Sequence, residues 1–128
     1  MGWLKQSGSA TVAGLLALLA WSPLAAADNV ADDNYAAIAY SQDSGAYGYS
    51  NNYDSRDGAE ASAMRECGRD CSVVLWFRNA CGALATGEDN GYGTGWAMSR
   101  GEAEDVAMSN CNDVASECSV VRWVCTSR

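Results

Sequence analysis

The strongest constraint on the fold is a stretch that occurs twice in the chain without a gap. Residues 55–67, SRDGAEASAMREC, recur as residues 99–111, SRGEAEDVAMSNC, with seven identical positions. Each copy leads into a cysteine and a short apolar segment, 71–76 and 118–123, and both of these read C-S-V-V-x-W. An internal repeat of this kind indicates that one supersecondary unit is used twice.

The repeat extends upstream of this stretch. Residues 35–40, YAAIAY, are apolar throughout, as in a strand that is covered on both faces or by a neighbouring helix. They are followed by the turn signal Asp43-Ser44-Gly45 and a second strand at 46–50. Residues 82–86, the turn at 89–91 and the strand at 92–97 repeat this pattern. Each unit is therefore predicted to run strand, turn, strand, helix, strand.

Helical periodicity is plain in the duplicated stretch. Ala59, Ala63 and Cys67 are spaced i, i+4, i+8, and the second copy keeps this spacing. Small residues on this face allow a helix to lie close to a sheet. Ser55 and Ser99 are predicted N-caps, and Glu102 completes a capping box in the second copy only.

The strands expected after the helices, 73–77 and 120–124, are rich in β-branched and aromatic residues. Regular alternation places Val74 and Trp76 on one face, and the opposite face receives Val73, Leu75 and Phe77. Trp76 and its equivalent, Trp123, are expected in the core. Arg122 stands where the first copy has Leu75, so either that face is partly exposed in the second unit or Arg122 meets a carboxylate.

These elements predict an α+β fold built from two tandem β-β-α-β repeats, at about 35–80 and 81–125, within a single domain spanning 35–128. We expect one antiparallel or mostly antiparallel six-stranded sheet, with both helices on one face and an approximate two-fold axis between the units.

The N-terminus has the features of an export signal. Lys5 precedes an apolar run at 10–20, and Ala25-Ala26-Ala27 supplies the small residues that signal peptidase accepts, so residues 1–27 are predicted to be a signal peptide. The run is shorter than the roughly 20 residues that span a bilayer. Residues 28–34 are expected to form a flexible acidic leader. We predict a secreted or periplasmic protein without a membrane span after cleavage.

All six cysteines follow the predicted cleavage site, which favours three disulfides. Histidine and C-x-x-C pairs are absent from the sequence, so the usual zinc arrangements are missing. Six cysteines permit fifteen pairings, and the repeat favours three of them. The suggested pairs are Cys67–Cys71 and Cys111–Cys118 at the helix ends and Cys81–Cys125 joining the units.

The chain is strongly acidic, with sixteen acidic residues against eight basic ones. Cleavage of the predicted signal peptide removes Lys5 and no acid, so the exported part has a net charge of −9. Nucleic-acid binding is disfavoured because its affinity comes mainly from neutralising phosphates with Lys and Arg. A cationic partner is favoured instead. The alternative is that the acidity only keeps the protein soluble.

No catalytic constellation emerges from the sequence. Without histidine, neither a cysteine nucleophile nor a serine triad has its usual base. The glycine-rich stretch 91–96 lacks the lysine of a phosphate-binding loop. A glycosidase would need two carboxylates in one cleft. We predict no catalytic residue, no metal site and no cofactor.

Four aromatic residues on the second strands of the two hairpins form the candidate binding face: Tyr47, Tyr49, Tyr92 and Trp96. They could line an exposed surface suited to a sugar or a protein partner. Packing in the core is the competing interpretation.

Several of these motifs carry a resemblance. A-A-I-A-Y-S, G-A-Y-G-Y-S, S-R-x-x-A-E-x-x-A, C-x-V-V-x-W-F-R-N-x-C-G-A-L-A and V-V-R-W-V-C are similar to the bacterial secreted family catalogued as domain of unknown function 4189, from Tyr35 to Cys125. The resemblance implies an exported, cysteine-containing small α+β domain, and it assigns no established activity to any residue.

The sequence favours an exported, non-enzymatic, disulfide-stabilised binding module, for example an inhibitor or immunity-type partner of a cationic envelope or host protein. One alternative is a small carboxylate-dependent hydrolase acting on envelope polysaccharide. Another is a structural component of the envelope.

Overall fold

The structure is a computed structural model and describes residues 33–127. The expected signal peptide at 1–27 and residues 28–32 of the expected leader lie outside the described residues.

The order strand, strand, helix, strand occurs twice, as the repeat predicts. The first unit contains β2 (Tyr35–Tyr40), β3 (Tyr47–Tyr53), α2 (Arg56–Cys67) and β4 (Ser72–Arg78). The second contains β5 (Cys81–Thr86), the short 3-10 helix η4 (Glu88–Asn90), β6 (Tyr92–Ala97), α3 (Arg100–Asn112) and β7 (Ser119–Cys125). The α+β class and the repeat architecture therefore hold.

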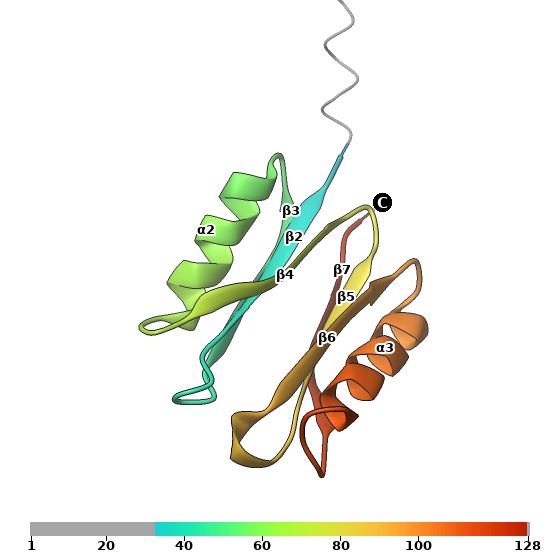
Figure 1. Ribbon diagram of the computed structural model, residues 1–128. Coiled ribbons are helices and arrows are strands. Elements are labelled where there is room, and N and C mark those ends of the chain that lie inside the picture. The colour runs from blue at the N-terminus through green and yellow to red at the C-terminus, as the bar shows by residue number, and fades with distance from the viewer. Residues whose placement is uncertain (1–32, 128) are drawn as a thin grey trace, which may run out of the picture. The chain divides into compact units, whose positions relative to one another are not determined.

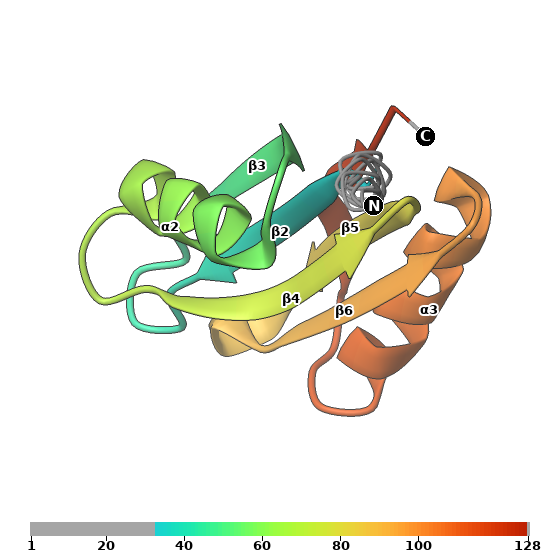
Figure 2. The same ribbon diagram turned by 90° about the horizontal axis from the view of Figure 1, so that it is seen from above.

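The strands form two three-stranded antiparallel sheets, which corrects the expectation of a single six-stranded sheet. The strand orders are β3-β2-β4 and β6-β5-β7, so the first strand of each repeat is the central one. The two sheets face each other, and α2 and α3 cover opposite outer sides rather than one common face (Figures 1 and 2). Each repeat completes its own sheet because β2 and β5 each use both edges for partners of their own unit.

Very small residues form the interface between each helix and its sheet. Ala59, Ala63 and Cys67 of α2 form one buried cluster with Ala37 and Ala39 of β2. The second repeat reproduces it with equivalent residues of α3 and β5. Small side chains on both surfaces bring the helix axis close to the strands, as the helical spacing predicts.

The layer between the sheets carries the larger side chains. Ile38 and Leu84, the equivalent residues of the two repeats, are fully buried in the same cluster. A second cluster in this layer contains Phe77 and Val124, the equivalent residues of β4 and β7. The central strands β2 and β5 are thus buried on both faces, which explains why their sequences are apolar throughout.

A β-bulge corrects the predicted faces of β4. The register with β2 shifts between the pairs Ile38–Leu75 and Ala39–Val73, so Val74 is an extra residue. Val74 packs with Leu75 between the sheets. Trp76 lies opposite Ala37, whose side chain packs against α2, and it is 38% exposed rather than part of the core.

The second repeat has the same bulge in β7, between Leu84 and Ala85. Its tryptophan, Trp123, is 39% exposed. The interruption of alternation is therefore a property of the repeat. Trp76 keeps its expected face, opposite Leu75, but β4 and β7 are edge strands and this face is partly exposed in both, so neither tryptophan is in the core.

The three disulfides of the structure are Cys67–Cys71, Cys111–Cys118 and Cys81–Cys125, the pairs that the repeat favours. The first two tie the end of each helix to the segment before the next strand. Cys81–Cys125 links β5 to its neighbour β7 at the pair Cys81↔Cys125. This bond lies within the second repeat, so the expectation that it joins the two units is wrong.

Candidate functional site

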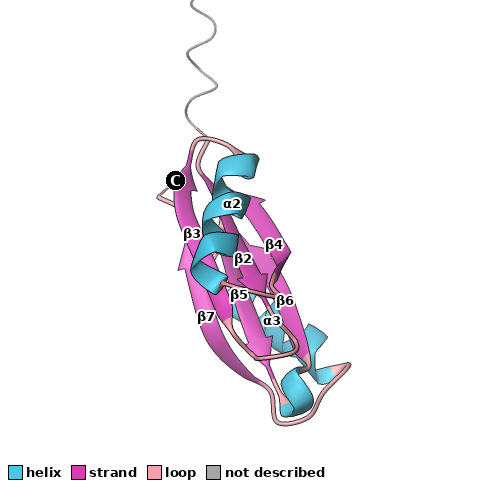
Figure 3. Cartoon of the chain, turned by 90° about the vertical axis from the view of Figure 1, so that its left-hand side faces the viewer, coloured by secondary structure: helices cyan, strands magenta, loops and turns pink. Residues whose placement is uncertain are grey.

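β4 of the first repeat runs beside β6 of the second (Figures 2 and 3). Residues of these two strands line a cleft. Its volume is about 350 Å³, and its lining residues are Trp76, Phe77, Arg78 and Trp96. Both bordering strands are edge strands of their sheets. The cleft is therefore a product of how the two repeats meet.

The cleft owes its shape to a glycine beneath it. A Cβ on Gly82 would lie 2.3 Å from Cε1 of Phe77, so the bare backbone leaves the space that the Phe77 ring occupies. Phe77 is buried, and Trp96 lies opposite Gly82 in the β5–β6 ladder. The Phe77 ring therefore packs against the backbone of Gly82, next to the strand that carries Trp96.

The rim of the cleft is aromatic and exposed. Trp96 is 55% exposed. The guanidinium of Arg56 lies 4.3 Å from the ring centre of Trp76, and Tyr35 stacks on Trp76 with ring centres 6.3 Å apart. Arg56 is itself held by Glu60, with Nε and Oε2 2.8 Å apart. The Trp76 ring is therefore held in place by its neighbours, while Trp96 projects into solvent.

Arg78, the charged residue that lines the cleft, forms an ion pair. Nη1 of Arg78 lies 3.3 Å from Oδ2 of Asp33, whose other carboxylate oxygen accepts a hydrogen bond from the Asn79 side chain at 3.1 Å. A hydrogen bond with Tyr35 and the charge of Asp33 raise the pKa of Arg78 above its usual value. The backbone N–H of Asn34 donates to Oδ1 of Asn79, so the last two residues of the expected leader are held against the first repeat.

The second repeat contains only part of this arrangement. Arg100 lies 3.9 Å from the ring centre of Trp123 and pairs with Glu104, as Arg56 does with Trp76 and Glu60. The residues after Trp123 are Val124 and Cys125, where the first repeat has Phe77 and Arg78. Cys125 is consumed by its disulfide.

The partner strand differs as well. β3 has Asn51 after its buried Ser50, where β6 has Trp96 after its buried Gly95. The next residue, Asn52, hydrogen bonds through its side chain to the amide and hydroxyl of Ser127 at 2.9 Å each. The two repeats thus diverge at the positions that build the cleft.

The structure does not gather the four candidate aromatic residues on one exposed face. Tyr47, Tyr49 and Tyr92 are half-buried and pack on the cluster of Ile38 and Leu84 between the sheets. Of the four, only Trp96 lines the cleft. The position of a residue along a strand does not indicate whether its side chain lies between two sheets or faces solvent.

Polar contacts reinforce the inter-sheet position of these tyrosines. The hydroxyl of Tyr47 donates to the carbonyl oxygen of Val121 at 3.3 Å, and the ring centres of Tyr92 and Tyr40 are 5.0 Å apart. Arg122 reaches across from β7, its guanidinium 4.3 Å from the ring centre of Tyr49. Arg122 forms no ion pair with any described residue. Its guanidinium therefore contacts an aromatic ring, and the interpretation that paired Arg122 with a carboxylate is wrong.

Sequence reasoning missed Trp76, Phe77 and Arg78 as site residues. The signal that could have found them is the divergence of W-F-R in the first copy from W-V-C in the second. In a duplicated fold, the residues that stabilise both units are the same in the two copies. The residues of a site that forms at only one place therefore differ between the copies.

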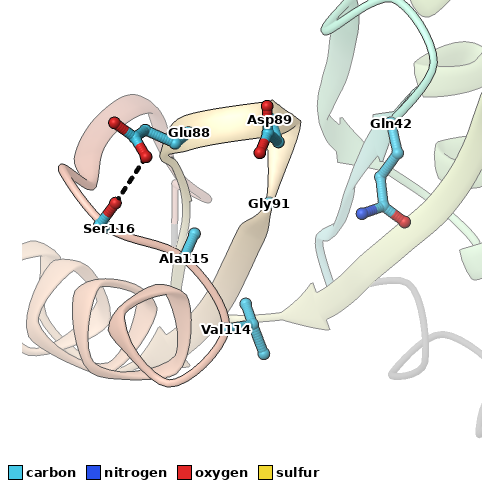
Figure 4. A pocket seen from close by; sticks show the side chains of 7 residues that line it. All are labelled: Gln42, Glu88, Asp89, Gly91, Val114, Ala115 and Ser116. Atoms are coloured by element: carbon cyan, nitrogen blue, oxygen red, sulfur yellow. Dashed lines mark hydrogen bonds between the residues drawn. The ribbon is translucent and has the colours of Figure 1, made fainter.

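A second, more polar pocket of about 470 Å³ lies beside η4 (Figure 4). Its lining residues are Gln42, Glu88, Asp89, Gly91, Val114, Ala115 and Ser116. Glu88 is turned toward Ser116, whose hydroxyl donates to its carboxylate at 2.9 Å, whereas Asp89 points elsewhere (Figure 4). Two carboxylates therefore border one pocket, and one of them already has a partner.

Within residues 33–127, no helix is long and apolar enough to cross a lipid bilayer. No three cysteine, aspartate or glutamate side chains there are grouped so as to hold a metal ion.

Known proteins share both the fold and the sequence pattern. The NMR structure of Rv1813c from Mycobacterium tuberculosis superposes with a TM-score of 0.56 at 32% identity, covering 72% of this chain and 74% of that one. Protein Rv1269c of M. tuberculosis and Protein Mb1300c of Mycobacterium bovis are each 48% identical over 59 residues. Those 59 residues are 45% of this chain, and the match spans somewhat under half of each relative's length, 46%.

The family comparison covers nearly all of the described residues. Residues 35–125 match the family described as domain of unknown function DUF4189, and they include both repeats and all six cysteines. The chain belongs to this family.

Proposed function

We propose that this protein is an exported, non-enzymatic binding module whose partner is a cationic protein of the cell envelope or of a host. It would act as an inhibitor or immunity-type partner. The observation that carries the proposal is the excess of unpaired acidic side chains. Residues 33–127 contain fourteen aspartates and glutamates against six arginines, and three acids in this range form ion pairs.

Such a charge distribution accelerates association with a positively charged surface. The acids on the two helices are mostly exposed, for example Asp57, Glu66, Glu102 and Asp105, so their charge acts on the solvent side of the molecule. The protein therefore offers a cationic partner a favourable field before any contact is made.

Two features support export and a binding role. All six cysteines are paired in disulfides, which persist in oxidising compartments. Three disulfides within a unit this small also provide a rigid scaffold, and rigidity lowers the entropic cost of binding.

Salt-dependent capture tests the proposal. Residues 28–128 with intact disulfides are immobilised and exposed to envelope extract at about 50 mM and about 500 mM NaCl, where the Debye length falls several-fold. The expected result is a defined basic protein that is retained at low salt and released at high salt. Its purified form should then associate more slowly as salt rises, with a smaller change in dissociation rate. Equal retention at both salt concentrations, or no retained protein, would contradict the electrostatic proposal.

The second pocket favours one alternative, a small hydrolase acting on envelope polysaccharide through carboxylates. Glu88 and Asp89 are its candidates because both border that pocket. Turnover of polysaccharide that is abolished by Glu88→Gln or Asp89→Asn, and unaffected by Asp43→Asn in the first hairpin turn, would favour the hydrolase. Absence of turnover in the parent protein would remove it.

A further inference from the structure

We infer that the cleft between β4 and β6 is a binding site for a short neutral saccharide, of which one or two pyranose rings occupy the cleft. This inference is independent of the cationic partner proposed above, because it concerns an aromatic site rather than the acidic surface. The first reason is size. A volume of about 350 Å³ falls at the lower end of the range of small-molecule sites, roughly 300–1,000 Å³.

The second reason is the chemistry of the rim. One face of a pyranose ring carries C–H bonds with partial positive charge, and these meet the negative face of an aromatic ring favourably. Trp96 exposes more than half of its surface, and Trp76 exposes 38% while Arg56 and Tyr35 hold its ring. Two partly exposed tryptophans therefore border one cleft, and contiguous exposed aromatic surface is typical of a binding site.

The third reason is the polar group beside these rings. The guanidinium of Arg78 presents several N–H donors in one plane, and Asp33 next to it presents acceptor oxygens. Neighbouring sugar hydroxyls can both donate and accept, so they match such a pair. Because Asp33 already balances the charge of Arg78, the site favours a neutral ligand over an acidic one.

An extended peptide is the competing ligand class, and the structure disfavours it. A peptide that adds to an exposed sheet edge needs a regular row of free backbone N–H and C=O groups. The bulge at Val74 interrupts that row in β4, and bulges are a usual means of protecting edge strands.

The repeat supplies a matched control within the same molecule. Trp123 has nearly the same exposure as Trp76 and an equivalent arginine, Arg100, over its ring, but it is not among the residues that line this cleft. Replacement of Trp96 by Asn installs the residue that the first repeat carries at the equivalent position, Asn51. Since Trp96 is largely exposed, this substitution leaves the buried layers intact.

The test uses 15N-labelled residues 28–128 with intact disulfides. Cellotriose, maltotriose and the trimer of N-acetylglucosamine are titrated separately, and the indole N–H resonances of the three tryptophans are followed. At least one trisaccharide should shift the resonances of Trp96 and Trp76 saturably and leave that of Trp123 in place. Trp96→Asn should weaken this binding at least tenfold, and Trp123→Ala should leave it unchanged within twofold.

Three outcomes would overturn the inference. The first is that none of the three trisaccharides shifts the resonance of Trp96. The second is an equal shift at Trp123, which would mean nonspecific stacking on any exposed indole. The third is a set of saturable shifts in the β4 backbone amides with an extended peptide and none with the sugars, which would assign the edge to peptides instead. The assay contains no cationic protein, so the absence of saccharide binding would not bear on the proposed cationic partner. That partner is tested separately by the salt-dependent capture.

Discussion

Individual glycines lie where each helix comes closest to its sheet, and Gly93 of β6 is one of them. A Cβ at this position would lie 2.2 Å from the amide nitrogen of Cys111 and 2.6 Å from the carbonyl oxygen of Ala107, both backbone atoms of α3. Gly48 has the same relation to α2. We predict that Gly93→Ala lowers the free energy of unfolding by about 2–3 kcal/mol, because the helix must move away from the sheet.

The matched control for this substitution is Gly101→Ala. Gly101 lies in the first turn of α3, and nothing lies within 4 Å of the Cβ that would be added. Since alanine is the better helix former, this change should be neutral or stabilise by up to about 1 kcal/mol. Urea denaturation compares the two variants. Equal stability of both would show that the close approach has no energetic consequence.

Tyr40 gives a prediction about pH at the same scale. Burial, and then the neighbouring Tyr92, raise the pKa of Tyr40 above its usual value near 10. The folded protein therefore holds this proton more tightly than the unfolded chain does. The resulting stability is fully present below about pH 10 and is lost as pH rises from there through the folded-state pKa.

Replacing Tyr40 by Phe should have two effects. It removes the hydrogen bond that the hydroxyl donates to the carbonyl oxygen of Asn90 at 3.0 Å, which costs about 1 kcal/mol at neutral pH. It should also flatten the loss of stability above pH 10. Tyr53→Phe, which removes a hydroxyl bonded to Ser62, should retain the alkaline slope of the parent. Urea midpoints at pH 7 and at pH 10–11 measure both effects, and an unchanged slope in Tyr40→Phe would contradict the prediction.

At the scale of elements, each helix begins at a serine cap whose sequence signal is local. Oγ of Ser55 accepts from the backbone N–H of Gly58 at 3.1 Å, and Oγ of Ser99 accepts from that of Glu102 at 3.3 Å. The predicted capping box of the second helix is altered, because the Glu102 carboxylate accepts from the Ser99 hydroxyl at 3.3 Å.

Removing either cap should destabilise the protein by about 1 kcal/mol. Ser55→Ala and Ser99→Ala each leave an unpaired N–H at a helix start. Ser72→Ala, at an exposed strand position, is the control and should change stability by less than about 0.5 kcal/mol. Thermal unfolding followed by circular dichroism measures all three. Cap variants that unfold at the temperature of Ser72→Ala would show that packing alone holds the helix starts.

The whole molecule is stabilised by disulfides that enclose very different lengths of chain. Cys81 and Cys125 are separated by 44 positions, and Cys67 and Cys71 by 4. In the chain-entropy model the longer loop contributes about 4 kcal/mol and the shorter about 2 kcal/mol. We predict that the double variant Cys81→Ser/Cys125→Ser loses about 2 kcal/mol more stability than Cys67→Ser/Cys71→Ser. Guanidinium denaturation of both, with the remaining bonds verified by mass spectrometry, tests this order, and the reverse order would contradict it.

The sequence by itself determined the features that depend on neighbours along the chain. The repeat, its hairpins, its helices and the two cysteine pairs at the helix ends follow from spacing, turn residues and caps, all of which act within a few residues. The small-residue face at Ala59 and Ala63 also indicated close helix packing, and the structure places it against Ala37 and Ala39.

Only the tertiary structure decided how the two units meet. One six-stranded sheet and two facing sheets use the same strands with the same local patterns, so alternation along a strand cannot distinguish them. A bulge of one residue then placed Val74 on the same face as Leu75 and opposite to that of Trp76, since the side-chain period of a regular strand is two. The β4–β6 cleft combines Trp76 of one repeat with Trp96 of the other, and it exists because separate sheets bring their edge strands together.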